Sequence, residues 1–501
     1  MDAQSPQHQA QATGPTRRHV LSGLVASAVV GFSTFSQTWV TAAQAATSAT
    51  PIDPLPPLDG TVSFDNESKL LDSRDEGNIV TRLPFAVLRP GSASDVAAMI
   101  RYCRRHHLKV AARGQAHTTF GQGLTTGLLI ENRSLQQIHS IRPDVADVDA
   151  GVLWTELMEA AVAQNLTPPL FTDYTDLSIA GTLTVGGVSS HNNQGLQIDH
   201  VQELEVVTGT GAIMSCSMTN NRDLFEAALG GLGQFGIITR AKISLVPAKP
   251  LVRVYLLHYT DNAVFFRDLR ALLDRGEMDG VINRWIPNPD GTLGLTYELV
   301  ANIAYDPAQP PDDERLLRGL SQPPTAVGKA DLPYPVFITQ VNSLVDFFKQ
   351  ALNWDSLVKP WLDVWLSDTA VEQYVADLVA SLGPDDIGAG GFFVLAAQRR
   401  SKVTRPFFRV PAPDGSDWIY LVDLLTAFPG PNPELTDKML KRNRRLFDAA
   451  HKTGGTRYPI GAIEFSQTDW AAQYGDSWPE FVSRKHQFDP DNILTPGVGI
   501  F

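Results

Sequence analysis

The chain is long, moderately hydrophobic and acidic. It has 501 residues, of which 43% are hydrophobic and 19% charged, and its net charge is -13. This length exceeds what one hydrophobic core organises, and the apolar content is too high for disorder, so two globular units are expected. The acidity and the lack of a long basic run argue against nucleic acid as a partner, because binding to phosphates requires clustered Lys and Arg.

The first residues are typical of an export signal. Arg17 and Arg18 precede an apolar run from Val20 to Phe32, and Ala43-Gln44-Ala45 then offers small residues to a signal peptidase. A membrane anchor is the alternative, but a helix of this run spans only about 20 Å of a hydrocarbon core of about 30 Å. The segment resembles a bacterial twin-arginine signal. Residues 1–45 are therefore predicted to direct export to the periplasm or the medium, leaving a mature form without a membrane span.

The next residues, 46–60, are predicted to form an extended linker because proline is frequent there and fixes the backbone angle. Strand-like runs and an amphipathic helix follow, with strands at 86–88 and 109–112 and the helix at 95–106. This pattern indicates a strand–helix–strand opening, with Ser92 or Ser94 as the helix cap. After Pro250 a strand at 252–257 and a helix at 262–273 mark the start of a second domain.

Two cysteines, Cys103 and Cys216, are present, which excludes a disulfide-rich scaffold. The spacing leaves open whether they pair in an oxidising compartment. Two buried free thiols are the simpler expectation.

A glycine-rich stretch follows the strand at 109–112, running from Ala111 to Gly123 around a polar centre. Successive backbone amides in such a turn can bind a diphosphate, although any glycine-rich turn after a strand looks similar. His117 lies at its centre. A histidine in this place is either an exposed loop residue or a nucleophile that can bond covalently to a flavin.

Several motifs, in order, resemble those of cytokinin dehydrogenases, which belong to the vanillyl-alcohol-oxidase superfamily with the PCMH-type FAD-binding fold. The resemblance covers about residues 80 to 501. It is carried by Arg113-Gly114-Gln115-Ala116-His117-Thr118, Phe171-Thr172-Asp173-Tyr174, Ala180-Gly181-Thr182-Leu183, Glu205-Val206-Val207-Thr208-Gly209, Gly230 to Arg240, Lys359-Pro360-Trp361-Leu362-Asp363, Phe488-Asp489-Pro490 and Leu494-Thr495-Pro496-Gly497.

The resemblance implies a two-domain α+β protein. Residues 61–250 and a C-terminal return, 450–501, are expected to form the PCMH-type FAD-binding domain, and residues 251–449 an inserted α/β substrate-binding domain. A dinucleotide Rossmann fold is not expected, because no Gly-x-Gly-x-x-Gly with a following acidic residue opens the chain.

The resemblance also implies the site. His117 is expected to carry FAD covalently, through a single bond, since no cysteine lies between Asp173 and Thr184 to provide a second. Asp173 is expected near the flavin as the acceptor of the substrate amine proton. No metal ligands are expected. Further FAD contacts are predicted at Gly114, Gln115, Ala116, Thr118, Gln122, Ser178, Thr184, Val188, Ile238, Tyr458 and Thr495.

Some positions depart from the family pattern. Ile282 occupies the position where a glutamate of the family helps to hold the adenine-like ring, and losing such a hydrogen bond typically costs about 1–3 kcal/mol. Val498 stands where the family usually has a glutamine. Among the tryptophans of the second domain, Trp285, Trp365 and Trp418 are expected in core packing, whereas Trp361 is expected over the active site.

The predicted function is oxidation of a small, cytokinin-like amine (an N6-substituted adenine) by hydride transfer to FAD, with oxygen or another acceptor reoxidising the flavin. An oxidase of another small amine, alcohol or sugar is the alternative. A third possibility, from a different class, is a flavin- or ligand-binding protein that has lost catalysis.

Overall fold

The computed structural model describes residues 29–33, 36–47, 52–286, 296–388 and 391–501, and the chain divides into two compact units, Met1–Pro57 and Leu58–Phe501. In the small unit the strands pair in the order β2-β1-β3. The bounds are β1 Val29–Ser33, β2 Thr38–Thr41, α2 Ala42–Thr47 and β3 Ile52–Pro54. The predicted signal's Arg17 and Arg18, and its apolar run as far as residue 28, lie outside the described residues.

The first sheet of the large unit has the strand order β4-β5-β7-β6. Its strands are β4 Thr61–Ser63, β5 Ala86–Arg89, β6 Val110–Arg113 and β7 Leu128–Glu131. Helix α4 (Ala93–Arg105) joins β5 to β6, and both strands run parallel to β7, which lies between them. The predicted strand–helix–strand opening is confirmed. Its helix begins at Ser92, whose hydroxyl accepts a hydrogen bond from the amide of Asp95 at 3.4 Å.

The second sheet is antiparallel, with the order β12-β11-β13-β9-β8. Its strands are β8 Ile138–Arg142, β9 Val145–Asp149, β11 Val201–Val207, β12 Ile213–Ser217 and β13 Ile237–Ser244. The nearby short elements are α5 Trp154–Val162, β10 Leu166–Thr167, α6 Ile179–Val185, α7 Arg222–Ala228 and β14 Val246–Pro247, whereas α3 Asn66–Leu71 lies against β5 of the first sheet. Cys103 and Cys216 are buried in α4 and β12 as free thiols, as expected.

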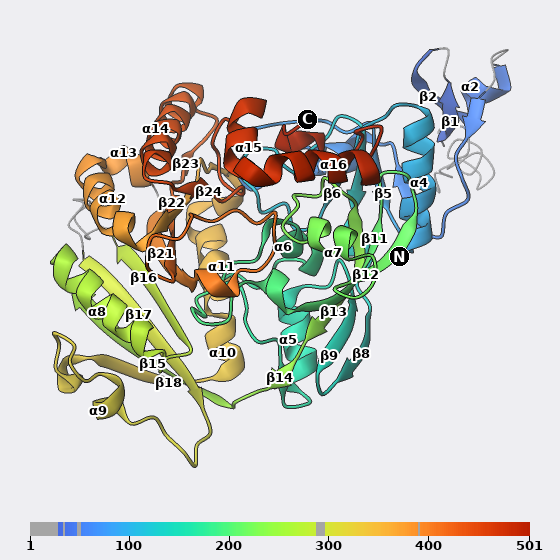
Figure 1. Cartoon of the computed structure of the whole chain (residues 1–501). Helices are drawn as coiled ribbons and strands as arrows, with labels where there is room; N and C mark the ends of the chain where they lie inside the picture. The colour runs from blue at the N-terminus through green and yellow to red at the C-terminus, as the bar shows by residue number, and fades with distance from the viewer. Residues whose placement is uncertain (1–28, 34–35, 48–51, 287–295, 389–390) are drawn as a thin grey trace, which may run out of the picture. The chain divides into compact units, whose positions relative to one another are not determined.

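The large sheet is also antiparallel, in the order β18-β15-β17-β16-β21-β22-β20-β24. Its strands are β15 Leu251–Tyr259, β16 Gly280–Ile286, β17 Thr296–Tyr305, β18 Gly328–Pro333, β20 Leu362–Ser367, β21 Phe392–Arg399, β22 Trp418–Leu425 and β24 Thr456–Arg457. Helices α8 (Asn262–Arg275) and α12 (Asp368–Ser381) cover one face (Figure 1). Apolar side chains from this face and these helices form a shared core. The opposite face turns toward the rest of the large unit, where Trp365, Ile419 and Leu421 join a second core.

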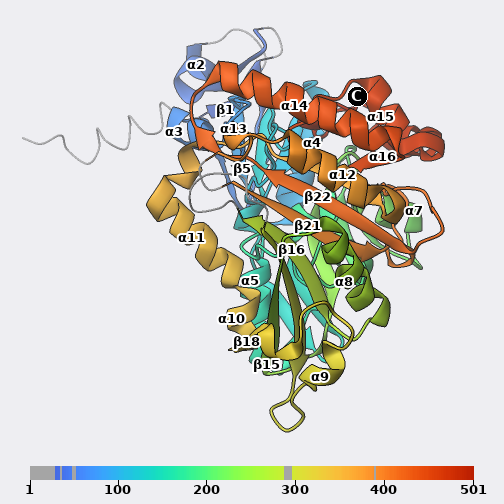
Figure 2. The same cartoon turned by 90° about the vertical axis from the view of Figure 1, so that its left-hand side faces the viewer.

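Two helices lie beside the edge of the large sheet, α10 (Tyr334–Ile338) and α11 (Gln340–Leu352) (Figure 2). Helix α10 packs against β15 and β18. The remaining short elements are α9 Asp313–Leu316, β19 Leu357–Val358, α13 Pro384–Ile387 and β23 Phe428–Pro429.

The C-terminal segment contacts both the large sheet and the first sheet. It contains α14 Pro433–Lys452, β24, α15 Gln467–Tyr474 and α16 Trp478–Phe488. The predicted boundary at residue 450 falls inside α14, and β24 still pairs with the large sheet. Beyond α16 the chain joins the first sheet, where the Val110 amide donates to the Ile493 carbonyl at 2.8 Å and the Thr495 amide donates to the Val110 carbonyl at 2.7 Å.

The large unit is therefore a mixed α+β structure, as predicted. Among the described residues, none of the helices combines the length and apolar character that crossing a bilayer requires. The tryptophans expected in core packing, Trp285, Trp365 and Trp418, are all buried within hydrophobic cores.

Candidate active site

A cavity of about 690 Å³ is lined by loops of the first and second sheets, by α10 and α11, and by the face of the large sheet opposite α8 and α12. Ligand pockets in proteins usually measure about 300–1,000 Å³, so this cavity is large enough to bind a small molecule. All residues predicted for the site contribute to its wall. They are Gly114, Gln115, Ala116, His117, Thr118, Gln122, Asp173, Ser178, Thr184, Val188, Ile238, Ile282, Trp361, Tyr458 and Thr495.

The loop after β6 brings its backbone close to the start of α6. A Cβ atom at Gly114 would lie 1.8 Å from the hydroxyl oxygen of Ser178, so only glycine fits there. Ala116 adopts a left-handed conformation with φ of 53°. This costs a non-glycine residue about 1–2 kcal/mol, and a hydrogen bond from the Glu76 amide to the Ala116 carbonyl at 2.9 Å helps to hold it. The loop geometry presents the next residue, His117, to the cavity.

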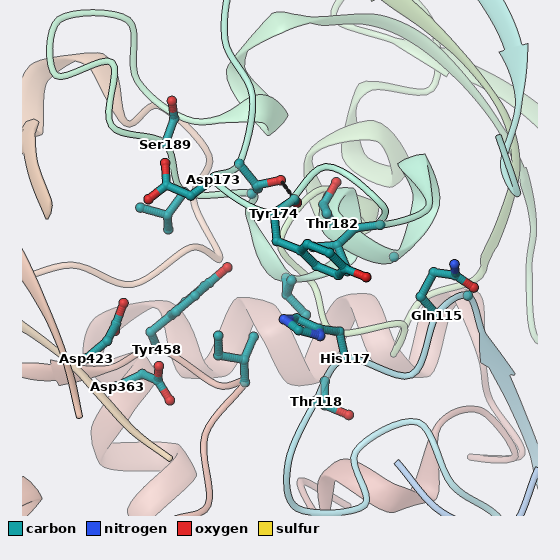
Figure 3. A pocket seen from close by; sticks show the side chains of 18 of the residues that line it. Gln115, His117, Thr118, Asp173, Tyr174, Thr182, Ser189, Asp363, Asp423 and Tyr458 are labelled. Atoms are coloured by element: carbon teal, nitrogen blue, oxygen red, sulfur yellow. Dashed lines mark hydrogen bonds between the residues drawn. The ribbon is translucent and has the colours of Figure 1, made fainter. Parts of the chain in front are cut away.

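His117 lies beside two aromatic rings. Its imidazole centroid is 5.2 Å from that of Tyr174, which lies next to it in Figure 3. The centroid of the Trp361 ring is 5.3 Å from that of His117. Burial lowers the pKa of His117, with Glu76 opposing the shift and Lys359 adding to it. The ring is therefore neutral at physiological pH, and a neutral imidazole has a nitrogen lone pair available for bonding.

A buried charged network supports this part of the cavity. The Lys359 ammonium is fully buried and lies 3.1 Å from the Glu76 carboxylate, which also accepts a hydrogen bond from the Trp354 indole at 2.8 Å. The Lys359 ammonium is 4.9 Å from the centroid of the Trp354 ring. Lys359 and Pro360 precede Trp361 directly, so the network fixes the start of β20 beside His117.

Asp173 lies in the cavity wall, in the loop that precedes α6. Burial raises the pKa of Asp173 to about 6, while the positive charge of Arg284 and a hydrogen bond to Ser190 lower it. Arg284 belongs to β16 and pairs with Glu298 of β17 at 3.4 Å. At pH 7 Asp173 is mostly ionised and can accept a proton from a bound amine.

Several of the predicted polar contact residues already bond to the protein. The hydroxyls of Thr184 and Thr495 donate to the carbonyls of Gly181 and Gly233, both at 2.8 Å. The Gln122 amide donates to carbonyls of the C-terminal segment, including that of Gly461 at 3.1 Å. These side chains shape the wall by holding backbone segments together.

Some polar atoms of the cavity wall are buried and have no hydrogen-bond partner among the described residues. The hydroxyl oxygen of Ser178 and the amide oxygen of Asn132 are among them. Because buried polar groups in proteins are nearly always bonded, these atoms indicate that a ligand completes the site.

Comparison with known proteins identifies this arrangement. Residues 84–217 match the family model described as an FAD-binding domain, and residues 292–501 match the one described as cytokinin dehydrogenase 1, FAD and cytokinin binding. Cytokinin dehydrogenase 4 of Oryza sativa subsp. japonica is 31% identical over 485 residues, covering 89% of this chain and 90% of the rice protein. The chain belongs to the cytokinin dehydrogenase family.

Other relatives agree with this assignment. Cytokinin dehydrogenase 1 of Arabidopsis thaliana is 30% identical over 488 residues, covering 89% of this chain and 83% of that protein. An uncharacterized oxidoreductase of the fasciation locus of Rhodococcoides fascians is 34% identical over 426 residues, covering 84% of this chain and 95% of that protein. The predicted resemblance is confirmed, and this member of the cytokinin dehydrogenase family is an FAD-linked oxidoreductase.

The sequence did not point to several cavity residues of this family member. Arg284 and Asp423 lie on strands whose pairing partners are distant in sequence, and Trp354 lies in a short turn before β19. Asp363 ends the motif Lys359-Pro360-Trp361-Leu362-Asp363, but the motif predicted no role for its side chain. Strand alternation places Arg284 on the same face as Ile282, so register was the one signal that could have identified it.

Proposed function

We propose that this protein oxidises a cytokinin-like amine, an N6-substituted adenine, with FAD held by a single covalent bond to His117. The observation that carries the proposal is that His117, with its neutral ring beside Tyr174 and Trp361, and Asp173, with a pKa near 6, line one cavity. The names of the rice and Arabidopsis relatives support the substrate class.

The residues of the cavity fit the cofactor. Gly114 admits close approach to the loop backbone, and the unpaired oxygens of Ser178 and Asn132 provide acceptors for a bound group. The lone pair of the neutral His117 ring provides the nucleophile for covalent attachment. FAD, when bound, supplies a two-electron acceptor for the hydride that leaves the substrate carbon.

Asp173 assists this oxidation by moving one proton. The N–H of the substrate amine becomes acidic as hydride leaves the neighbouring carbon, and the Asp173 carboxylate accepts that proton. The carbon–nitrogen bond becomes an imine, which water hydrolyses to an aldehyde and the free amine. Arg284 opposes protonation of Asp173 before the reaction, because its positive charge favours the carboxylate.

The test is anaerobic mixing of the purified flavoprotein with a panel of N6-substituted adenines, simple amines, alcohols and sugars. Loss of the oxidised flavin absorbance with the N6-substituted adenines, faster than with the other classes, is the expected result. Faster reduction by an alcohol or a sugar would instead establish the alternative oxidase. No reduction by any class would establish a binding protein without catalysis.

Export is part of the proposal and rests on the paired arginines of the predicted signal. Substituting Arg17→Lys together with Arg18→Lys is expected to keep the protein in the cytoplasm, which fractionation and immunoblotting of a bacterial host would show. The matched control is Arg104→Lys with Arg105→Lys, an adjacent pair in α4. Export of the first variant at the wild-type level would contradict the proposed signal.

A further inference from the structure

Two aspartates face each other on the cavity side of the large sheet. Asp363 of β20 and Asp423 of β22 are directly opposite in the strand register, and both line the cavity. Side chains at such positions lie on the same face with Cβ atoms about 4.5–5.5 Å apart. Figure 3 shows the two carboxyl groups beside Tyr458, on the opposite side of Tyr458 from His117.

The pair begins a polar row that crosses the sheet. In register, Asp423 is opposite Val394 of β21, Val394 is opposite Arg284 of β16, and Arg284 is opposite Glu298 of β17. An apolar row lies two residues along the strands and also lines the cavity, with Val300, Ile282, Ala396 and Leu421 as its members. A flat molecule placed on this face therefore meets an apolar surface flanked by polar groups at one side.

The carboxyl groups are not fully satisfied by the protein. Asp363 is fully buried, and the carboxyl groups of Asp363 and Asp423 are hydrogen-bonded to each other. Apart from that bond, the described residues donate no hydrogen bond to either oxygen of Asp363 or to one oxygen of Asp423. Buried polar atoms without partners each cost about 1–3 kcal/mol. The remaining acceptor positions of the pair face the cavity wall without a protein donor, which is the arrangement expected where a ligand completes the site.

The local charges indicate what kind of ligand fits. Burial raises the pKa of Asp363 to about 7 and that of Asp423 well above its ordinary value, and the charges of Asp363 and Asp173 add to the effect on Asp423, so the pair retains at least one proton near neutral pH. The buried Arg457 guanidinium lies close enough to lower the pKa of Asp363. When one of the two acids is protonated, the negative charge of the other is balanced by the Arg457 guanidinium. The pair then offers an O–H donor from the protonated acid and acceptor oxygens from the carboxylate.

We propose that Asp363 and Asp423 form a recognition subsite for a neutral nitrogen heterocycle, one that presents an N–H beside a lone-pair ring nitrogen. The protonated carboxyl donates to the ring nitrogen and the carboxylate accepts from the N–H. This deepens the proposed function and rests on it, because adenine has such edges. It also provides polar recognition on a sheet where Ile282 offers none.

A protonated amine suits the pair less well. An ammonium has only donors, so it would require both carboxyl groups to ionise side by side in a buried place. The neighbouring Arg457 charge already balances the single negative charge of the half-protonated pair. The two ligand classes therefore differ in the protonation state they demand, and binding measurements separate them.

The experiment measures adenine binding to the flavin-loaded enzyme by calorimetry, since adenine has no side chain to oxidise. Asp423→Val, which removes the polar group and matches the neighbouring Val394, is expected to weaken adenine binding about 10- to 100-fold. Asp423→Asn keeps one donor and one set of acceptors, and is expected to stay within about threefold of wild type. Asp331→Asn, on the exposed edge strand β18, is the control and is expected to change nothing.

Thermal unfolding separates recognition from a structural role. Removing one of two crowded buried acids is expected to leave the Tm of Asp423→Val equal to or above that of the wild type while binding falls. A structural role would lower Tm and binding together. Equal adenine affinity in wild type and Asp423→Val would overturn the proposal, as would tighter binding of a diamine such as putrescine through the same residues.

A turnover measurement completes the test. N6-benzyladenine and N-benzylaniline share the benzylic amine, but only the first has ring nitrogens, so Asp423→Val is expected to raise KM for the first alone. If no amine reduces the flavin but adenine binding still depends on Asp423, the proposed oxidation fails and the subsite stands. If N6-benzyladenine is oxidised and adenine binding is independent of Asp423, only the subsite fails.

Discussion

The cavity has two walls built in different ways. The flavin-side wall consists of the loops that contain Gly114 to Thr118 and Phe171 to Ser190, and its shape depends on the backbone: a glycine against Ser178, a left-handed Ala116, and amide hydrogen bonds. The sheet wall consists of the cavity-facing side chains of β16, β17, β20, β21 and β22. There the backbone is an ordinary antiparallel ladder, and the chemistry lies in the alternating side chains.

This difference means that the two walls tolerate change differently. A substitution on the flavin-side wall must satisfy a special backbone conformation, as Ala116 does at an energetic cost. A substitution on the sheet wall replaces one projecting side chain and leaves the strand in place, so substrate recognition can change one residue at a time. We expect variants of the flavin-side wall to have the larger effects.

The largest effect is expected at His117. In the wild-type protein the yellow colour should stay with the pellet after acid precipitation, and in His117→Ala it should pass entirely into the supernatant, because the ring nitrogen that forms the bond is gone. His191→Ala is the matched control, since His191 is another histidine of the cavity wall. A yellow pellet from His117→Ala, or a colourless one from His191→Ala, would show that the attachment point is wrong.

Asp173→Asn is expected to slow flavin reduction by about 10²–10⁴-fold, because an amide cannot accept the amine proton. In the wild type the reduction rate should fall as pH drops below about 6, where Asp173 becomes protonated, and this dependence should vanish in the variant. Stopped-flow absorbance measures both. Asp176→Asn is the control, because Asp176 accepts a hydrogen bond from Thr155 and lies outside the cavity lining. An unchanged rate in Asp173→Asn would remove Asp173 from the chemistry.

The residues of the flavin-side wall could be picked out from the sequence as cavity residues because their signals are local. The glycines, His117 and Asp173 occur in short ordered motifs, and the strand–helix–strand opening with Ser92 as cap follows from periodicity and capping preferences. The assignment of Trp361 to the cavity came from the same kind of motif, whereas the other three tryptophans were expected in the cores because tryptophan is usually buried there. These features depend on residues within a few positions of one another.

The sheet wall was harder to predict because it depends on register. Asp363 and Asp423 are 60 positions apart in sequence and become neighbours only through the pairing of β20 with β22. The charge of Arg284 acts on Asp173, and no spacing in the sequence encodes that interaction. The pairing of β7 between β5 and β6 was missed for the same reason, since it joins segments by long-range hydrogen bonds.

The smallest expected effect comes from Arg284, which acts on Asp173 through its charge alone. Arg284→Gln is expected to move the acid limb of the reduction rate to higher pH by about one unit, because the carboxylate loses a stabilising cation and its pKa rises further above the ordinary value. At pH 7 the rate should fall by no more than about threefold, since part of Asp173 stays ionised.

Glu298→Gln is the matched variant. It removes the carboxylate that offsets the Arg284 charge, so the acid limb of its reduction rate should move the opposite way, to lower pH. Rates of flavin reduction between pH 5 and 8 measure both shifts. Opposite shifts would show that the sheet wall tunes the base of the flavin-side wall, whereas shifts of the same sign, or none, would show that the two walls act independently.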